Sequence, residues 1–134
     1  MLLLNLDHVA VAVTDLDAAL ERHLRMFGGS VVARERVEEQ GVEEAMIAVG
    51  GSHVQLVAPL SADTPVGRFL ERRGEGLHHL AYAVADIDTA LADLAAEGAE
   101  MIDTAARLGG GGRRIAFVHP KSFAGTLIEL VEIT

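Results

Sequence analysis

The chain contains one fifteen-residue pattern twice, and this repeat constrains its fold more than any other feature. Residues 6–20 read LDHVAVAVTDLDAAL and residues 77–91 read LHHLAYAVADIDTAL, with nine of fifteen positions identical at a fixed offset of 71. A shorter echo at an offset of 74 relates VQLV at 54–57 to IELV at 128–131. A gapless match of this quality indicates an internal duplication. We therefore expect two copies of one structural module.

Hydrophobic periodicity and turn residues predict the same element order in both copies. In each copy a strand comes first, an aspartate then caps a helix, and three strands follow. In the first copy the strands are expected at 5–13, 30–37, 42–49 and 53–58, with Asp15 as the cap. In the second copy they are expected from 77 and near 100–103, 114–118 and 125–132, with Asp86 as the cap.

The predicted fold class is α+β, with two tandem βαβββ modules that form an open, curved sheet around a metal site. A module of this kind cannot bury both of its faces alone. The 134 residues are therefore expected to make a single domain, with modules at about 1–60 and 77–134. The linker, 61–76, is expected to carry a short helix from about 65 to 73.

Composition excludes several classes of function. The chain has no cysteine, which removes disulfides, thiolate catalysis and sulfur-ligated metal sites. Its net charge of −9 argues against nucleic acid as a partner. No stretch approaches the ~18 apolar residues of a membrane span. We expect a cytoplasmic protein, in which an anionic ligand would meet a local basic patch drawn from Arg68, Arg72, Arg73, Arg113, Arg114 and Lys121.

Two histidines occupy equivalent places in the duplication, His8 and His79. His8 shares a strand face with Ala10 and Ala12, and His79 shares one with Ala81 and Ala83. Faces with such small side chains predict a hollow beside the imidazole rather than a packed core. The last strand of each copy carries one polar residue among aliphatics, Gln55 or Glu129. Two imidazoles, a carboxylate and an amide oxygen suit a divalent ion such as Co, Ni, Mn, Fe or Zn. The remaining histidines are interpreted as structural.

The chain also resembles the methylmalonyl-CoA epimerases, a family of the vicinal oxygen chelate superfamily, over essentially its whole length. The stretches that carry the resemblance are LDHVAVAV, EEQGVEEAMIAVG, HVQLVAPLSADTPVGRFLERRGEGLHHLAYAVADID and GGGGRRIAFVHPKSFAGTLIELVE. It implies metal ligands at His8, Gln55, His79 and Glu129, with cobalt as the first choice of ion. It also implies Glu44 and Glu129 as the acid/base pair, which interconverts 2R and 2S methylmalonyl-CoA through a metal-stabilised enolate.

Two further expectations follow from this resemblance. Lys121, in the HPKS turn, is a candidate contact for the phosphates of coenzyme A, and the chain is expected to form a homodimer. The glycine run 109–112 either brings backbone amides to phosphate or forms a plain hairpin turn.

Three other functions fit the same scaffold. A glyoxalase I-like lyase would use the same metal chelation on a glutathione hemithioacetal. An extradiol dioxygenase would bind iron through His8, His79 and Glu129 alone. A metal-free antibiotic-binding protein would use only the hollow, and it would not require four ligands.

Overall fold

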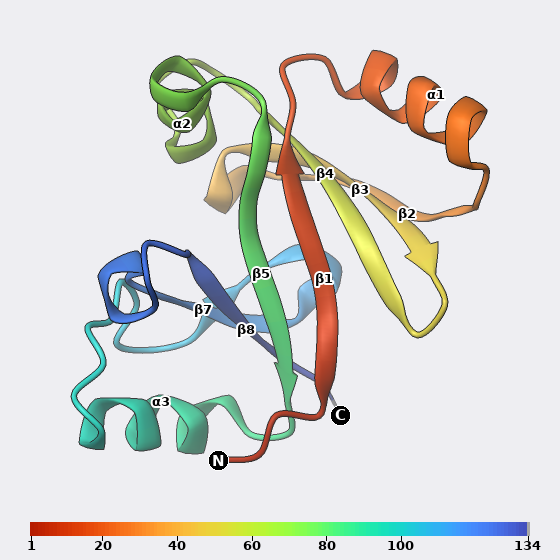
Figure 1. Cartoon of the computed structure of the whole chain (residues 1–134). Coiled ribbons are helices and arrows are strands. Elements are labelled where there is room, and N and C mark those ends of the chain that lie inside the picture. Colours follow the sequence, from red (N-terminus) through yellow and green to blue (C-terminus); the bar gives the residue numbers. More distant parts are fainter. Residues whose placement is uncertain (134) are drawn as a thin grey trace. The chain divides into compact units, whose positions relative to one another are not determined.

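The computed structural model describes residues 1–133 of the 134-residue chain (Figure 1). The strands and helices follow the predicted order, and short 3₁₀ turns lie at Glu38–Gln40, Gly110–Gly112 and Pro120–Ser122. In chain order the elements are β1 (Asn5–Ala12), α1 (Leu16–Phe27), β2 (Val31–Val37), β3 (Val42–Val49), β4 (Ser52–Pro59), α2 (Pro65–Arg73), β5 (Gly76–Val84), α3 (Ile87–Ala96), β6 (Arg107–Leu108), β7 (Arg114–Val118) and β8 (Ile128–Glu132). The predicted α+β class and the repeated βαβββ order are confirmed.

The capping aspartates explain where the two long helices begin. The side chain of Asp15 accepts a hydrogen bond from the amide of Ala18, and that of Asp86 accepts one from Thr89, both at 3.1 Å. Each satisfies one of the free amides in the first helical turn. Within the described residues, no helix is long and apolar enough to cross a membrane.

The chain divides into two compact units, one formed by residues 9–78 and the other by residues 1–8 with those from 79 onward. Helix α2, expected in a linker, therefore groups with the first copy of the repeat. The opening residues group with the second copy, where the amide of Leu4 donates to the carbonyl of Ala83 at 2.9 Å.

In the unit of residues 9–78 the strand order is β2-β3-β4-β1, with β1 parallel to β4 and the other pairs antiparallel. Helix α1 covers one face, where Leu16 packs with Ile47 and Leu56. The apolar residues of the other face, which include Val57, pack with Val66 of α2. Both faces of this sheet are therefore part of a core.

In the other unit the order is β5-β8-β7-β6, with β5 parallel to β8. Helix α3 packs on one face through Ile87 and Leu91, against Leu130. On the opposite face Phe117 and Val131 form a second cluster. The strand predicted near 100–103 is wrong, because this region is paired only by a single bridge from Met101 to Val118.

The chain leaves the ladder there because a side chain replaces the next backbone pairing. The carboxylate of Asp103 accepts a hydrogen bond from the amide of Phe117 at 2.8 Å. The amides of Ile102 and Asp103 both donate to the Phe117 carbonyl, at 3.0 and 3.1 Å. A side chain that bonds the backbone in this way competes with regular strand pairing. Regular pairing resumes at β6.

The register makes the duplication visible in three dimensions. In one unit Ala10 lies opposite Gln55 across the parallel pair of strands, and in the other Ala81 lies opposite Glu129. The two polar residues thus hold equivalent positions, as the offset of 74 predicted. This arrangement places Glu129 beside the strand that carries His79.

The alanine faces do not behave as predicted. Ala12 packs in a cluster with Val37, Val42 and Val57, and Ala81 packs with Phe117. The prediction that Ala12 and Ala81 line a hollow is therefore wrong, and the same expectation for Ala10 and Ala83 stays a prediction. Both Ala12 and Ala81 are instead fully buried in clusters with larger apolar side chains of the same unit.

Candidate metal centre

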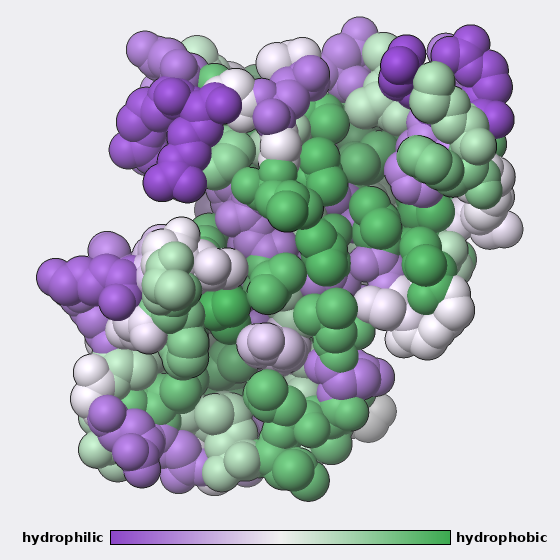
Figure 2. Space-filling view, viewed as in Figure 1, coloured by the Kyte–Doolittle hydropathy of each residue, from purple (hydrophilic) through white to green (hydrophobic). Residues whose placement is uncertain are grey.

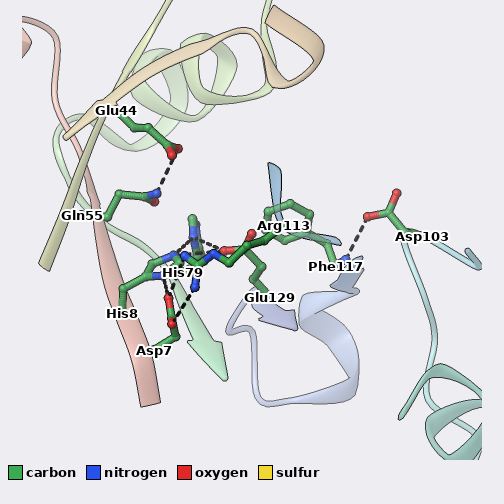
Figure 3. Close-up of polar contacts among 9 residues, drawn as sticks. All are labelled: Asp7, His8, Glu44, Gln55, His79, Asp103, Arg113, Phe117 and Glu129. Carbon is green, nitrogen blue, oxygen red and sulfur yellow. Dashed lines mark hydrogen bonds and ion pairs between the residues drawn. The ribbon is translucent and has the colours of Figure 1, made fainter. Parts of the chain in front are cut away.

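Three predicted ligands converge in the unit that contains both ends of the chain. The Nε2 atoms of His8 and His79 lie 3.2 Å apart. Glu129 places Oε1 3.0 Å from the first of these nitrogens and 3.1 Å from the second. All three side chains are buried, and Figure 3 shows them facing one another. The sequence prediction that brought His8, His79 and Glu129 together is supported by this geometry.

The spacing of these three atoms fits a divalent ion. Ligands held about 2.1 Å from a metal at right angles lie about 3.0 Å apart, whereas a tetrahedral angle separates them by about 3.4 Å. The observed separations of 3.0 to 3.2 Å are close to the first value. Two imidazoles and one carboxylate on one side of an ion also form a recurrent site for transition metals. The donor set and its spacing therefore fit a divalent ion.

Two of the three groups, Glu129 and His8, have strongly shifted pKa values when no metal is present. Burial opposes the charge on Glu129, but hydrogen bonds from His79 and His8 prevail and lower its pKa to about 2. Burial likewise disfavours the imidazolium of His8, but hydrogen bonds to Asp7 and Glu129 raise its pKa to about 9. Ligating imidazole is neutral, so metal must displace this proton from His8.

A second carboxylate, that of Asp7, contacts His8 on the side of the ring away from Glu129, and Arg113 contacts Asp7. Oδ2 of Asp7 lies 2.7 Å from Nδ1 of His8, the ring nitrogen opposite the one that faces Glu129. Arg113 donates to both oxygens of this carboxylate, at 3.0 and 3.4 Å. Burial opposes the Asp7 charge, but its bonds to His8 and Arg113 lower the pKa to about 2. Asp7 is therefore a charged, buried partner of a predicted ligand.

The other two predicted site residues meet in the unit of residues 9–78. Glu44, on β3, and Gln55, on β4, are both buried. Nε2 of Gln55 donates to Oε2 of Glu44 at 3.0 Å (Figure 3). The buried carboxylate predicted to be a base is thus oriented by the amide predicted to be a ligand.

The remaining candidates lie in loops and at the surface. Lys121 is exposed and forms an ion pair with Glu100 at 3.3 Å. Arg114 pairs with Asp88 and Glu132, at 2.7 and 3.3 Å. The glycine run forms the hairpin loop between β6 and β7, closed by a 2.8 Å bond from the amide of Gly109 to the carbonyl of Arg113.

Sequence reasoning missed the contact of Asp7 with His8, and it assigned Arg113 only to a basic patch for an anionic ligand. One signal was available. Position 7 is a charged residue within a strand whose same-face neighbours, Val9 and Val11, are apolar. Its equivalent in the repeat is His78, so the duplication does not point to it. An unpaired carboxylate would be costly in such a place, which indicates a partner.

A family model described as the Glyoxalase/Bleomycin resistance protein/Dioxygenase superfamily matches residues 7–117. Among curated proteins, the ethylmalonyl-CoA/methylmalonyl-CoA epimerase of Cereibacter sphaeroides is 35% identical over 131 residues, which is 96% of this chain and 98% of that protein. The human mitochondrial methylmalonyl-CoA epimerase is 32% identical over an alignment that covers 94% of this chain and 72% of the human protein.

Solved structures give the same result. A Ser-to-Thr variant of the Streptomyces coelicolor methylmalonyl-CoA epimerase, in complex with 2-nitronate-propionyl-CoA, is 40% identical with a TM-score of 0.95. The alignment covers 98% of this chain and 95% of that one. The Mycobacterium tuberculosis methylmalonyl-CoA epimerase is also 40% identical, with a TM-score of 0.95 and coverage of 99% and 90%. The resemblance seen in the sequence is confirmed.

Proposed function

The chain belongs to the glyoxalase/bleomycin resistance protein/dioxygenase superfamily, and from this premise we propose that it interconverts the 2R and 2S forms of methylmalonyl-CoA. The observation that carries the proposal is the buried His8, His79 and Glu129 cluster, in a chain that aligns along nearly its whole length with such epimerases. The predicted enzyme class, an isomerase, is confirmed by these relatives.

We further propose that His8, His79 and Glu129 hold one divalent ion and that Gln55 is a fourth ligand. Gln55 is supported by its register, since it lies opposite Ala10 as Glu129 lies opposite Ala81. Two imidazoles and two oxygens favour cobalt, with nickel, manganese, zinc and iron as alternatives. When bound, the ion supplies a Lewis acid for the thioester oxygen, which makes the proton on carbon 2 more acidic.

The protein's own groups would then move that proton. Inversion of a stereocentre requires a proton acceptor on one side and a donor on the other. Glu44 and Glu129 are the proposed pair. Glu44 suits the role of base because its carboxylate is buried and held in place by the amide of Gln55. A base with a fixed position needs little reorganisation during the reaction.

The acyl group and the coenzyme A contacts are also proposals. One relative is named for both ethylmalonyl-CoA and methylmalonyl-CoA, so both substrates require a test. Lys121 is exposed, and its ion pair with Glu100 at 3.3 Å would have to open for the amine to bind a phosphate. The cytoplasmic location and the homodimer remain predictions. Large apolar side chains at residues 1–4 are exposed. Figure 2 shows hydrophobic as well as hydrophilic residues on the face that it draws.

The deciding experiment follows the proton on carbon 2. Purified protein loaded with Co²⁺ is mixed with one stereoisomer of methylmalonyl-CoA in deuterated water, and the reaction is followed by NMR. We expect deuterium at carbon 2 together with racemisation, and we expect both to stop after treatment with a chelator. Ethylmalonyl-CoA, a glutathione hemithioacetal and a catechol are run in parallel. Turnover of the hemithioacetal or the catechol, without exchange in methylmalonyl-CoA, would replace this function by a lyase or a dioxygenase.

A further inference from the structure

Three side chains form a continuous chain of polar contacts that ends at the metal centre. Both terminal nitrogens of Arg113 donate hydrogen bonds to the carboxylate of Asp7, at 3.0 and 3.4 Å. Asp7 in turn lies 2.7 Å from Nδ1 of His8, and Nε2 of the same ring lies 3.0 Å from Glu129. Asp7 and His8 are both buried, whereas Arg113 is about one-third exposed. Figure 3 shows Asp7 and Arg113 beside the histidine ring.

We infer that Asp7 and Arg113 are positioning residues for the metal centre: Asp7 fixes the ring of His8 through Nδ1, and Arg113 fixes Asp7. The inference deepens the function proposed above and rests on its metal site. Neither residue is expected to touch the ion or the substrate. Their effect is to keep Nε2 of His8 facing Glu129 and His79.

The physical need for such a device follows from the histidine itself. An imidazole has two nitrogens that can bind metal, and rotation of the ring exchanges them. A carboxylate on one nitrogen fixes the ring orientation and the tautomer, and it raises the basicity of the other nitrogen. Asp7 meets this description, since it bonds the nitrogen that faces away from Glu129.

Asp7 also needs support, because it is the neighbour of His8 in a strand. Successive strand residues point to opposite faces, so the Asp7 carboxylate must be held toward the adjacent side chain. A two-pronged contact from arginine supplies both the direction and the neutralising charge. Lysine would supply only the charge.

The glycine run explains how Arg113 reaches Asp7. Gly111 and Gly112 both have positive φ, at 69° and 70°, a conformation that side chains with a Cβ disfavour. These two residues turn the loop between β6 and β7 and deliver Arg113 just before β7 begins. The run is therefore assigned to the support of the metal centre.

We call the contacts from Arg113 to Asp7 and from Asp7 to His8 the relay. The rate at which the metal-loaded protein releases its ion tests it. The Co²⁺ form is mixed with excess chelator, and the dissociation rate is measured from the loss of the cobalt absorption. Loss of a carboxylate behind a ligating histidine typically weakens metal binding about 10- to 100-fold, so Asp7→Asn and Asp7→Ala should release Co²⁺ faster by this order. Arg113→Gln should lie between these variants and the wild type, and Arg113→Lys should recover part of the difference.

Arg114→Gln is the matched control. It removes the neighbouring arginine, which is similarly exposed but pairs with Asp88 and Glu132. Its release rate should equal that of the wild type. A second measurement uses the metal-free protein, in which the Nδ1 proton of His8 should give a low-field NMR signal that Asp7→Ala removes while the other histidine signals persist.

The outcomes separate this inference from the function on which it rests. Equal release rates in Asp7→Ala, Arg113→Gln and the wild type, with the low-field signal unchanged, would overturn the relay alone. A wild type that binds Co²⁺ but does not exchange the carbon 2 proton would overturn the proposed reaction and leave the relay standing. A wild type that binds no Co²⁺ would overturn both.

Discussion

Replacement of Glu44 by glutamine should abolish inversion while the protein stays folded. The carboxylate is buried and accepts a hydrogen bond from Gln55 at 3.0 Å. The amide oxygen of glutamine has the same position and accepts the same bond, so the loss is that of a charge-assisted bond relative to a neutral one, about 1 kcal/mol. Loss of a positioned base costs about 10²- to 10⁴-fold in rate, or about 3 to 5 kcal/mol in activation free energy. The catalytic effect should therefore exceed the effect on stability.

The assay supplies each stereoisomer separately in deuterated water and measures exchange and inversion by NMR. A two-base mechanism predicts an asymmetric result for Glu44→Gln. One stereoisomer should still exchange its proton through Glu129, whereas neither should invert, and bound Co²⁺ should remain at one per chain.

The chain offers a matched control one residue away. Glu43 lies on the same strand, is partly exposed and pairs with Arg34 at 3.3 Å. Glu43→Gln makes the same chemical change on the opposite face and should invert the substrate at the wild-type rate. Inversion at the wild-type rate by Glu44→Gln would refute its role as the base. Equal losses in both variants, together with lower melting temperatures, would attribute the effect to folding instead.

Three other predictions concern the metal and the fold. His79→Ala should lose stoichiometric metal by elemental analysis yet keep its circular dichroism spectrum, and a variant that retains one ion per chain would remove His79 from the ligand set. Gly67→Ala should lower the melting temperature and the free energy of unfolding, the latter by about 1 to 3 kcal/mol. The added Cβ would lie 2.6 Å from two backbone carbonyl oxygens in the preceding turn. As a control, Gly51→Ala should be nearly neutral, because its Cβ would meet nothing within 4 Å. In metal-free protein, the stability contributed by Glu129 should be present above pH 4.5 and lost as the pH falls toward 2. The stability contributed by His8 should be present below pH 6.5 and lost as the pH rises through 9. Urea unfolding across pH measures both, and an alkaline loss that persists in His8→Asn would assign it to another group.

The duplication made the placement of the proposed ligands predictable because it copies position as well as sequence. His8 and His79 hold equivalent places, and the parallel registers of Gln55 and Glu129 match. The helix caps at Asp15 and Asp86 were predictable for a different reason, since a capping carboxylate acts within one turn of its own position. The equivalent histidines follow from repetition and the helix caps follow from local pattern, and a sequence displays repetition and local pattern directly.

The alanine faces show where such reasoning fails. Small side chains at Ala12 and Ala81 predict open space beside their strands, but both residues are buried in clusters with larger apolar side chains. Those neighbours lie on strands far away in the sequence, and their identity depends on strand order and register. Periodicity gives the face of a residue and not the size of what lies across from it.

The contacts that join Arg113 to Asp7 and Asp7 to His8 could not be predicted from the duplication, because they involve a residue that the second copy does not repeat. Duplication gives two similar strands, and the matching positions 8 and 79 both became buried histidines close to Glu129. The residues before them differ, since one copy has Asp7 and the other has His78. Asp7 is stable in its buried position because Arg113 neutralises it, and Arg113 sits on a glycine-rich loop that the first copy of the repeat lacks. An anionic partner behind only one of the two histidines makes the two sides of the proposed metal site unequal, and the duplication alone does not predict this inequality.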